Sequence, residues 1–187
     1  MGRWEPDAAG RLREAAMALY IERGFEGTTV AEIADRAGVT ARTFFRHFTD
    51  KREVLFAGSE ELEQCMVAAL TGAPPSAGPM DAIAAALLAV TEMFADRRDY
   101  SRRRQAVIAA TPELRERELI KMASLATAFA DALQQRGVGP AVASLAAETG
   151  VAVFRVAFER WVTEPGDAKL ADVMRATLAD LAGLTTH

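Results

Sequence analysis

The stretch 29–48 contains two helix-forming segments of similar length, separated by a turn that centres on Gly38. Thr29 and Glu32 have the spacing of a capping box, in which each side chain satisfies a backbone N–H at the start of a helix. Thr40 can cap the second segment in the same way. Because so short a connection forces the two helices to cross steeply around a shared core, the pattern predicts a helix-turn-helix.

The second of these segments, residues 40–48, has two chemically different faces. Phe44 and Phe48 lie one helical turn apart and are expected to hold the helix against the core. The residues expected to fill that core are Ile33, Ala34, Ala37, Val39, Phe44 and Phe48. Gly38 suits a corner where the backbone takes a positive φ. The residues expected to point away from the core are Ala41, Arg42, Phe45 and Arg46.

A local basic patch is predicted on an acidic chain. The formal net charge is -4, so no overall excess of positive charge indicates a nucleic-acid partner. Between residues 36 and 52, however, five arginines and lysines stand against a single acid, Asp50. Any interaction with nucleic acid is therefore expected to be confined to this part of the surface.

The remainder of the chain favours an all-α fold. Alanine, leucine, glutamate and arginine dominate, and long runs of β-branched residues are scarce. Apolar periodicity and helix stop signals predict about nine helices, at 12–23, 29–37, 40–48, 50–70, 81–94, 101–110, 111–136, 140–162 and 169–184. The stretch 71–79, rich in glycine and proline, reads as a loop. We expect a three-helix domain at 1–50, which carries the helix-turn-helix, and a larger helical domain at 51–187.

The composition also bears on location. A share of 50% hydrophobic and 26% charged residues is typical of a globular protein. The single cysteine, Cys65, excludes an internal disulfide and fits a reducing compartment. Residues 1–7 are expected to be mobile, and the N-terminus lacks the apolar core of a signal peptide. No run of about 18 uninterrupted apolar residues is found that would cross a bilayer. A soluble, cytoplasmic protein is expected.

The sequence TTVAEIADRAGVTARTFFRHFTDKREVL, at 28–55, resembles the DNA-binding domain of the tetracycline-repressor (TetR) family of bacterial regulators. The match extends over roughly residues 8 to 56. The resemblance implies that Ala41, Arg42 and Thr43 read bases, and that Thr29, Phe45, His47 and Lys51 contact the DNA backbone. The complete predicted DNA-binding set is Thr29, Thr40, Ala41, Arg42, Thr43, Phe45, Arg46, His47 and Lys51.

Individual members of this set have alternative roles. Arg42 can bind a guanine through two hydrogen bonds, and Thr43 can contact a thymine methyl group or a phosphate. His47 either caps the end of its helix or contacts a phosphate. The family commonly has tyrosine at the position of Phe45, and phenylalanine lacks the hydroxyl that would bind a phosphate. Phe45 is therefore expected to pack against sugars or thymine methyl groups instead.

The stretch RRRQAVIAATPELRERELIKMASLATAFADAL, at 102–133, is similar to the effector domains of an actinobacterial TetR subgroup that includes mycofactocin-type regulators. This resemblance implies a helical sensor for a small molecule. The residues on the helices that line the effector cavity in the family are Met66, Leu70, Met93, Phe94, Ile108, Met122, Phe129, Phe154 and Phe158. Such flexible apolar side chains can form an adaptable pocket, although each of them also suits an ordinary core position.

A homodimer is the expected assembly. The helix at 140–162 is apolar nearly all round and so needs to be covered on two sides, while the helix at 169–184 carries a narrower apolar stripe. Two copies can pair these helices across a two-fold axis, as the family does, and present two reading heads about 34–36 Å apart to a palindromic operator. A small apolar effector is expected to bind more tightly to a dimer whose two DNA-binding domains are wrongly spaced for the operator. The helix at 50–70 joins the DNA-binding domain to the sensor and is expected to transmit this change.

Several other interpretations are open. The basic run 96–104 either forms a second site for nucleic acid or an acidic ligand, or forms a solvated helix end paired with acids such as Glu60, Glu61 and Glu63. Cys65 reads as a small buried residue. An enzyme is not expected, because only two histidines are present and neither a phosphate loop nor metal-ligand spacing is found; no cofactor or metal is predicted. The C-terminal part is either a sensor or only a dimerisation scaffold, and the resemblance implies repression, the usual mode of the family.

Overall fold

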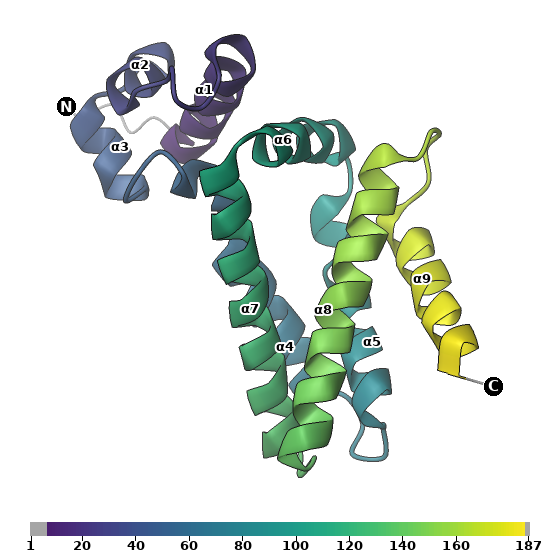
Figure 1. The fold of residues 1–187 in the computed structure, drawn as a ribbon. Coiled ribbons are helices and arrows are strands. Elements are labelled where there is room, and N and C mark those ends of the chain that lie inside the picture. The colour runs from purple at the N-terminus through teal and green to yellow at the C-terminus, as the bar shows by residue number, and fades with distance from the viewer. Residues whose placement is uncertain (1–6, 186–187) are drawn as a thin grey trace. The chain divides into compact units, whose positions relative to one another are not determined.

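The computed structural model describes residues 7–185, and its regular secondary structure within them consists of helices without strands, as predicted (Figure 1). These residues form nine α-helices and two short 3-10 helices, which confirms the expected fold class. The α-helices are α1 (Ala8–Arg23), α2 (Val30–Arg36), α3 (Ala41–His47), α4 (Ser59–Thr71), α5 (Pro79–Ala89), α6 (Arg98–Ala110), α7 (Pro112–Gln135), α8 (Pro140–Thr163) and α9 (Leu170–Thr185). The 3-10 helices are η1 (Glu53–Phe56) and η2 (Thr91–Phe94). Residues 1–6, where a mobile segment was expected, lie outside the described residues.

The described chain divides into two compact units. Unit 1 contains the residues up to Ala57 together with Arg103–Glu118. Unit 2 contains Gly58–Arg102 and the residues from Leu119 onward. Helices α6 and α7 each contribute residues to both units, so the polypeptide passes from one unit to the other three times.

Unit 1 is built on α1, α2 and α3, and each of the three packs against the other two (Figure 1). Helix η1 packs against α1 and buries three consecutive side chains, Val54, Leu55 and Phe56. The fully buried centre of the helical trio includes Leu12, Ile33 and Phe44.

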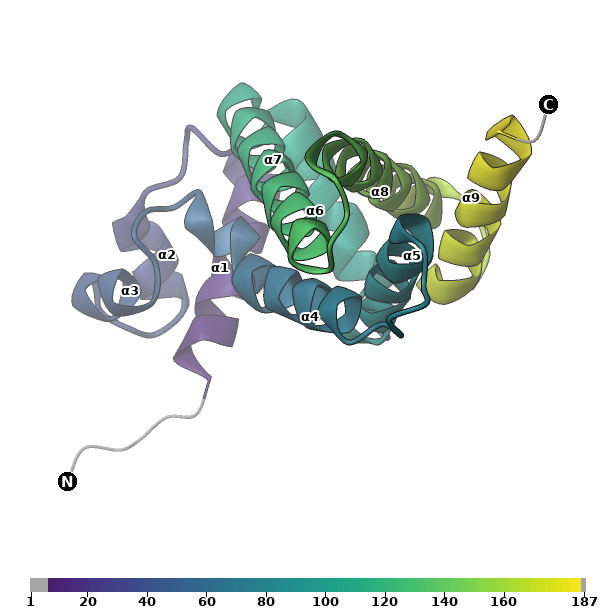
Figure 2. The ribbon, with the colours of Figure 1, turned by 90° about the horizontal axis from the view of Figure 1, so that it is seen from below.

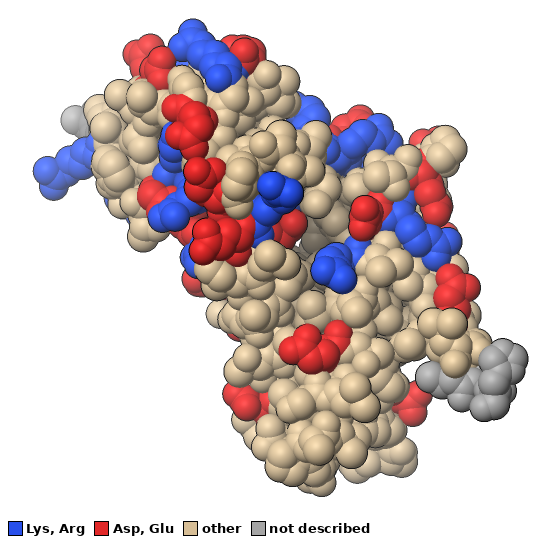
Figure 3. Space-filling view, viewed as in Figure 1, with Lys and Arg blue, Asp and Glu red and all other residues tan. Residues whose placement is uncertain are grey.

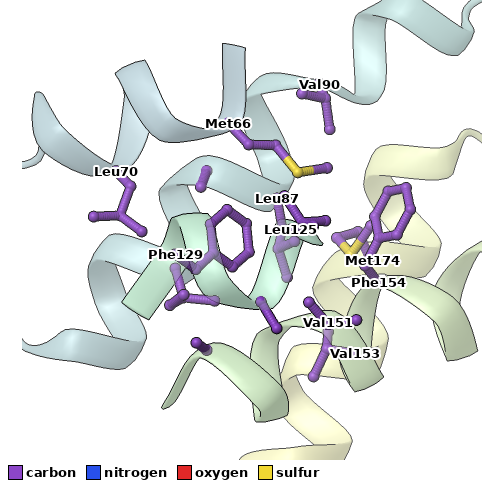
Figure 4. Packing of buried hydrophobic residues seen from close by; sticks show 14 of the residues in the cluster. Met66, Leu70, Leu87, Val90, Leu125, Phe129, Val151, Val153, Phe154 and Met174 are labelled. Carbon is purple, nitrogen blue, oxygen red and sulfur yellow. The ribbon is translucent and has the colours of Figure 1, made fainter. Parts of the chain in front are cut away.

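Unit 2 is built around α5, which packs against α4, α8 and α9 (Figure 2). Figure 4 shows the apolar cluster at its centre, where the Phe129 ring of α7 lies among side chains of the neighbouring helices. Met66 and Leu70 enter this cluster from α4, and Phe154 enters it from α8. Met174 adds a side chain from α9, so five helices share one apolar core.

Close packing in this core depends on one glycine of α8. A Cβ atom added to Gly150 would lie 2.6 Å from Cγ2 of Ile83 on α5 and 3.6 Å from the Phe129 ring. Real Cβ atoms do not approach other heavy atoms so closely. Glycine at this position therefore allows α5 and α8 to meet at their crossing.

The expectation of one continuous helix over 50–70 is wrong. The chain forms the 3-10 helix η1, passes through Gly58 with a φ of 86°, and begins α4 at Ser59. The positive φ of Gly58 is incompatible with a continuous α-helix, and it separates η1 from α4. The segment predicted as a helix at 81–94 is likewise divided, between α5 and η2.

Helix α8 is long and apolar enough to pass a length-and-composition test for a membrane span, and 44% of the window that passes lies buried inside the protein. Core helices of globular proteins pass the same test, so the result is weak. The apolar side chains that α8 leaves exposed are Val142, Leu145 and Val156.

Two arginines of the basic run, Arg98 and Arg102, bind backbone carbonyls at and just beyond the C-terminal end of α8. Arg98 donates from Nε to the Trp161 carbonyl at 2.7 Å, and its terminal nitrogens donate to the carbonyls of Glu164 and Gly166. Arg102 donates to the Val162 carbonyl at 2.9 Å. These are the unpaired carbonyls at the C-terminal end of α8, where positive charge also complements the helix dipole. The two arginines therefore act as a cap for α8.

Candidate nucleic-acid interface

Helix α2 begins with the predicted capping box. The Thr29 hydroxyl accepts a hydrogen bond from the Glu32 backbone N–H at 3.3 Å, and the Glu32 carboxylate accepts one from the Thr29 N–H at 2.8 Å. The Thr29 N–H and the Thr29 hydroxyl both donate to this carboxylate and hold the pKa of Glu32 below its ordinary value, with the backbone bond as the main cause. The start of α2 is thus fixed by residues within one turn of each other.

The turn between α2 and α3 has the predicted geometry. Gly38 has a φ of 69°, a conformation that favours glycine, and the Val39 N–H donates to the Ala34 carbonyl at 2.9 Å. Thr40 then caps α3 by accepting from the Thr43 N–H at 3.1 Å. The helix-turn-helix predicted from the sequence is present.

Two phenylalanines anchor α3 to unit 1. Phe44 is fully buried and Phe48 is buried at the end of the helix, with their ring centroids 5.6 Å apart. Five of the six predicted core residues are buried, and Val39 is half-buried. The burial of Phe44 fixes which side of α3 faces outward.

Most of the predicted DNA-binding residues are exposed on this outward side. Thr43 and Lys51 are half-buried, whereas the exposed residues are Thr29, Thr40, Ala41, Arg42, Phe45, Arg46 and His47. The Thr43 hydroxyl lies 3.1 Å from that of Thr40, so these two side chains also hold each other in place. Six of the nine residues lie on α3 and Thr40 caps it, whereas Thr29 and Lys51 lie outside that helix. Their role in DNA binding stays a prediction.

The cations of the basic stretch are not equally available. Arg36 binds the Glu22 carboxylate through two hydrogen bonds of 2.5 and 2.6 Å, and Arg52 binds Asp50 at 2.7 Å. These bonds lower the pKa of the Glu22 and Asp50 carboxyls. Arg42 and Arg46 are exposed, and the structure gives neither of them an ion-pair or hydrogen-bond partner among residues 7–185. They are the cations on α3 that can engage a ligand without leaving a partner.

Lys51 is bound within unit 1. Its ammonium donates to the carbonyls of Phe25 at 2.8 Å and Thr28 at 3.0 Å, and it lies 4.2 Å from the centroid of the Phe25 ring. The Tyr20 hydroxyl donates to the Lys51 carbonyl at 2.6 Å. One of the three ammonium hydrogens remains for a phosphate. The sequence analysis missed this arrangement, because the partners lie 23 to 31 positions away along the chain.

Two arginines that are distant in sequence bind η1, the 3-10 helix that follows α3. The sequence analysis missed these contacts. Arg104 donates to the Leu55 carbonyl at 2.7 Å and lies 5.0 Å from the centroid of the Phe56 ring. Arg117 pairs with Glu53 at 2.6 Å. Residues from α6 and α7 therefore stabilise the segment that leaves the helix-turn-helix, and no local sequence signal indicates them.

The residues predicted to line an effector site fall into three groups. Met66, Leu70, Phe129 and Phe154 are buried together in the core of unit 2, with Phe94, Met122 and Phe158 packed against them. Met93 is 38% exposed and lies outside that cluster. Ile108 is buried but belongs to unit 1.

Aromatic rings are concentrated at one end of this apolar cluster. The Phe94 ring of η2 lies 5.3 Å from that of Phe158 and 6.1 Å from that of Trp161. Phe154 stacks on Phe158 at 5.9 Å. Phe94 and Phe158 are only half-buried, so the cluster extends from the core to the surface of unit 2. Among the described residues, no group of three histidine, cysteine, aspartate or glutamate side chains is placed to hold a metal ion.

Two family models match the chain. Residues 12–57 match the model of bacterial regulatory proteins of the tetR family. Residues 77–185 match the model of the MftR C-terminal domain.

Individual relatives agree with these models. The chain is 38% identical over 80 residues to the transcriptional regulator TcmR of Streptomyces glaucescens, a segment that covers 43% of this chain and 35% of TcmR. It is 44% identical over 46 residues to the repressor KstR2 of Mycobacterium tuberculosis, which covers 25% of this chain and 23% of KstR2. The chain thus spans about a third or less of the length of these two relatives. It is also 27% identical over 168 residues to the putative mycofactocin biosynthesis regulator MftR of M. tuberculosis, covering 88% of this chain and 84% of MftR.

Solved structures share the fold. A TetR-family regulator from Syntrophomonas wolfei superposes with a TM-score of 0.69 at 16% identity, over 97% of this chain and 96% of that one. FadR of Bacillus subtilis, solved in complex with stearoyl-CoA, superposes with a TM-score of 0.62 at 17% identity, over 92% and 96% of the two chains. Taken with the helix-turn-helix and the exposed arginines of α3, these matches establish that the chain belongs to the tetR family of bacterial regulatory proteins, with a C-terminal domain of the MftR type.

Proposed function

We propose that this regulator is a ligand-responsive repressor, which binds a palindromic operator as a homodimer and is released from it by a small apolar molecule. The observation that carries the proposal is the outer surface of α3, where Arg42 and Arg46 are exposed and unpaired among the described residues while Phe44 is fully buried. The proposal assigns DNA binding to residues 1–50, and effector binding and dimerisation to residues 51–187. The protein would act in the cytoplasm.

In this proposal some exposed side chains contact bases and others contact phosphates. Arg42 and Arg46 carry donors in the planar arrangement that fits the O6 and N7 acceptors of guanine in the major groove. Thr29, His47 and the remaining N–H of Lys51 lie at the edges of the helix-turn-helix and contact phosphates. Phosphate contacts position the protein, and base contacts specify the sequence.

The homodimer is supported by apolar surface on α8. Val142, Leu145 and Val156 are exposed at helical spacing, and the lower part of the face in Figure 3 carries few charges over α7 and α8. Pairing α8 and α9 with the same helices of a second copy would cover this surface and give a two-fold symmetric dimer. The symmetry of the operator would follow from that of the dimer.

An apolar effector is supported by the composition of the unit 2 cluster. Methionine side chains such as Met66 and Met122 repack readily, and the half-buried rings of Phe94 and Phe158 give the cluster an edge at the surface. Because FadR of B. subtilis was solved with stearoyl-CoA, a long acyl thioester is a reasonable first probe. An effector would act by binding more tightly to a dimer in which the spacing of the two helix-turn-helix units does not match the operator.

The test of DNA binding begins with selection of duplexes by the full-length protein from a random pool. The selected duplex should be palindromic, and its affinity should fall as salt rises. Arg42→Ala should weaken binding to it about 5- to 150-fold, the range for one arginine–guanine pair. Arg97→Ala removes an equal charge from an exposed position in unit 2 and should leave the affinity unchanged. Equal losses in the two variants would contradict a role for α3 in reading bases.

A DNA-binding dimer whose C-terminal part is only a scaffold is the second candidate. It is favoured by the complete burial of Met66, Leu70 and Phe129, which already pack as a core. Thermal unfolding with stearoyl-CoA, coenzyme A and a panel of apolar metabolites separates the two candidates. A ligand that raises the melting temperature and releases the selected duplex supports the sensor; failure of the entire panel supports the scaffold.

A further inference from the structure

The outward face of α3 carries two parallel stripes of different chemistry. Ala41 and Phe45 are four residues apart and form an apolar stripe, and Arg42 and Arg46 form a cationic stripe beside it. All four side chains are exposed. A ligand that fits this face therefore has to offer apolar surface next to hydrogen-bond acceptors.

The Phe45 ring is exposed and contacts one buried ring. It is 58% exposed, and it is the only aromatic among the large hydrophobic side chains that are exposed in the described part of the chain. On its inner side the ring meets Phe44 edge to face, with centroids 5.4 Å apart and planes at 81°. Phe44 is itself fully buried and packs on Phe48, so the Phe45 ring rests on the core of unit 1.

An exposed phenyl ring can recognise only one kind of group on the base edges of the major groove. The ring has neither a hydrogen-bond donor nor an acceptor. Adenine, guanine and cytosine present polar atoms there, whereas thymine presents its C5-methyl group. Ala41 adds a second apolar contact one turn earlier along the same stripe.

We propose that Phe45, together with Ala41, selects thymine by packing against its methyl group, next to a guanine bound by the neighbouring arginine stripe. This inference rests on the proposed operator binding and adds to it the identity of one base in each half-site. The alternative role for Phe45 is packing against a deoxyribose, which every nucleotide carries. Such a contact would strengthen binding to all sequences alike, so the two roles differ in their dependence on the methyl group.

The test uses the full-length protein and its selected duplex, in which each thymine in turn is replaced by deoxyuridine. This change removes the methyl group and retains the hydrogen-bonding pattern of the base. At one thymine in each half-site, adjacent to a guanine, the substitution should weaken binding about fourfold, the factor expected when one methyl group is no longer buried. Replacement of the other thymines should have little effect.

Variants of Phe45 test whether the effect of deoxyuridine on binding depends on its phenyl ring. In Phe45→Ala, the thymine and deoxyuridine duplexes should bind equally well. Phe45→Leu keeps an apolar contact and should retain part of the difference. Both changes are at an exposed position, and circular dichroism of each variant should match that of the wild type.

Three outcomes would overturn the proposal, and they are distinguishable. If the wild type binds its duplex but deoxyuridine has no effect at any position, the thymine contact is absent while operator binding stands. If the deoxyuridine effect persists in Phe45→Ala, another residue reads the methyl group. If the wild type selects no duplex at all, operator binding fails and the thymine contact fails with it.

Discussion

Unit 1 adds capped helix ends, ion pairs and a lysine bound to backbone carbonyls to its apolar centre, whereas the centre of unit 2 is one apolar cluster to which five helices contribute. In unit 1 the polar contacts fix the direction of α3, and with it the position of each exposed side chain. In unit 2 the contacts are mostly between methyl groups, methionines and rings, which can exchange neighbours at small cost. A surface that reads bases needs fixed geometry, and an effector site benefits from adaptable packing.

The largest expected effect comes from removing one large side chain from each core. Phe44→Ala and Phe129→Ala should each lower the free energy of unfolding by about 3–5 kcal/mol, because both side chains are fully buried. Hydrogen exchange resolved by segment should show faster exchange in α1–α3 for the first variant and in α4, α5 and α8 for the second. Equal loss of protection throughout both variants would mean that the two units unfold as one.

A smaller effect is expected at the closest approach between helices of unit 2. Gly150→Ala would place a methyl group against Ile83 and should destabilise the protein by about 1–3 kcal/mol, measured by urea unfolding. Gly183→Ala is the matched control, since nothing lies within 4 Å of the added atom on α9. It should be stabilising by about 0.5–1 kcal/mol because alanine favours helix. A neutral Gly150→Ala would show that the unit 2 core absorbs volume even at its tightest contact.

The capping box of unit 1 should contribute less than either core. Thr29→Ala removes the hydroxyl that accepts from the Glu32 N–H and should cost about 1 kcal/mol. The control is Thr127→Ala in the middle of α7, where the hydroxyl only bonds back to the Ala123 carbonyl. That change should be close to neutral or slightly stabilising, since alanine is the better helix former. Equal costs in the urea midpoints of the two variants would argue against the cap.

The smallest expected effect is a dependence of unit 1 on pH. The pKa of Glu22 is lowered from its ordinary value of 4.5 by the hydrogen bonds from Arg36. A carboxyl whose pKa is lower in the folded state stabilises the protein fully above pH 4.5, and this contribution is lost as the pH falls through the lowered value. The stability difference between the wild type and Glu22→Gln should therefore shrink below pH 4.5. Glu26→Gln removes an equal charge from the same unit and serves as the control; a parallel loss there would point to net charge as the cause.

The helix-turn-helix could be predicted because its determinants lie within one turn of each other. Thr29 with Glu32, Gly38, and Thr40 with Thr43 are local signals, and the structure has each of them in its expected role. The division of 50–70 into η1 and α4 escaped prediction, because the 3-10 turn is held by residues far along the chain. Arg104 and Arg117 stand 49 and 64 positions from the atoms that they bind.

The residues predicted to bind an effector show a different reason why sequence does not determine a site. Met66, Leu70, Phe129 and Phe154 were predicted as one group, and they do lie together. A ligand cavity and a closed core, however, need the same apolar side chains at the same helical positions, so a sequence pattern alone cannot distinguish the two. Their assignment to an effector therefore stays a prediction. Buried packing that contains methionine side chains can also open for a ligand.

The internal partners of Arg36, Arg52 and Lys51 bear on how this regulator would search a chromosome. Attraction to random DNA grows with the number of phosphates that a protein neutralises. Three of the five cations between residues 36 and 52 are already engaged by acids or carbonyls, and the chain as a whole is negatively charged. Such a molecule would dwell only briefly at incorrect sites, and most of its discrimination would come from the few side chains of α3 that meet the correct one.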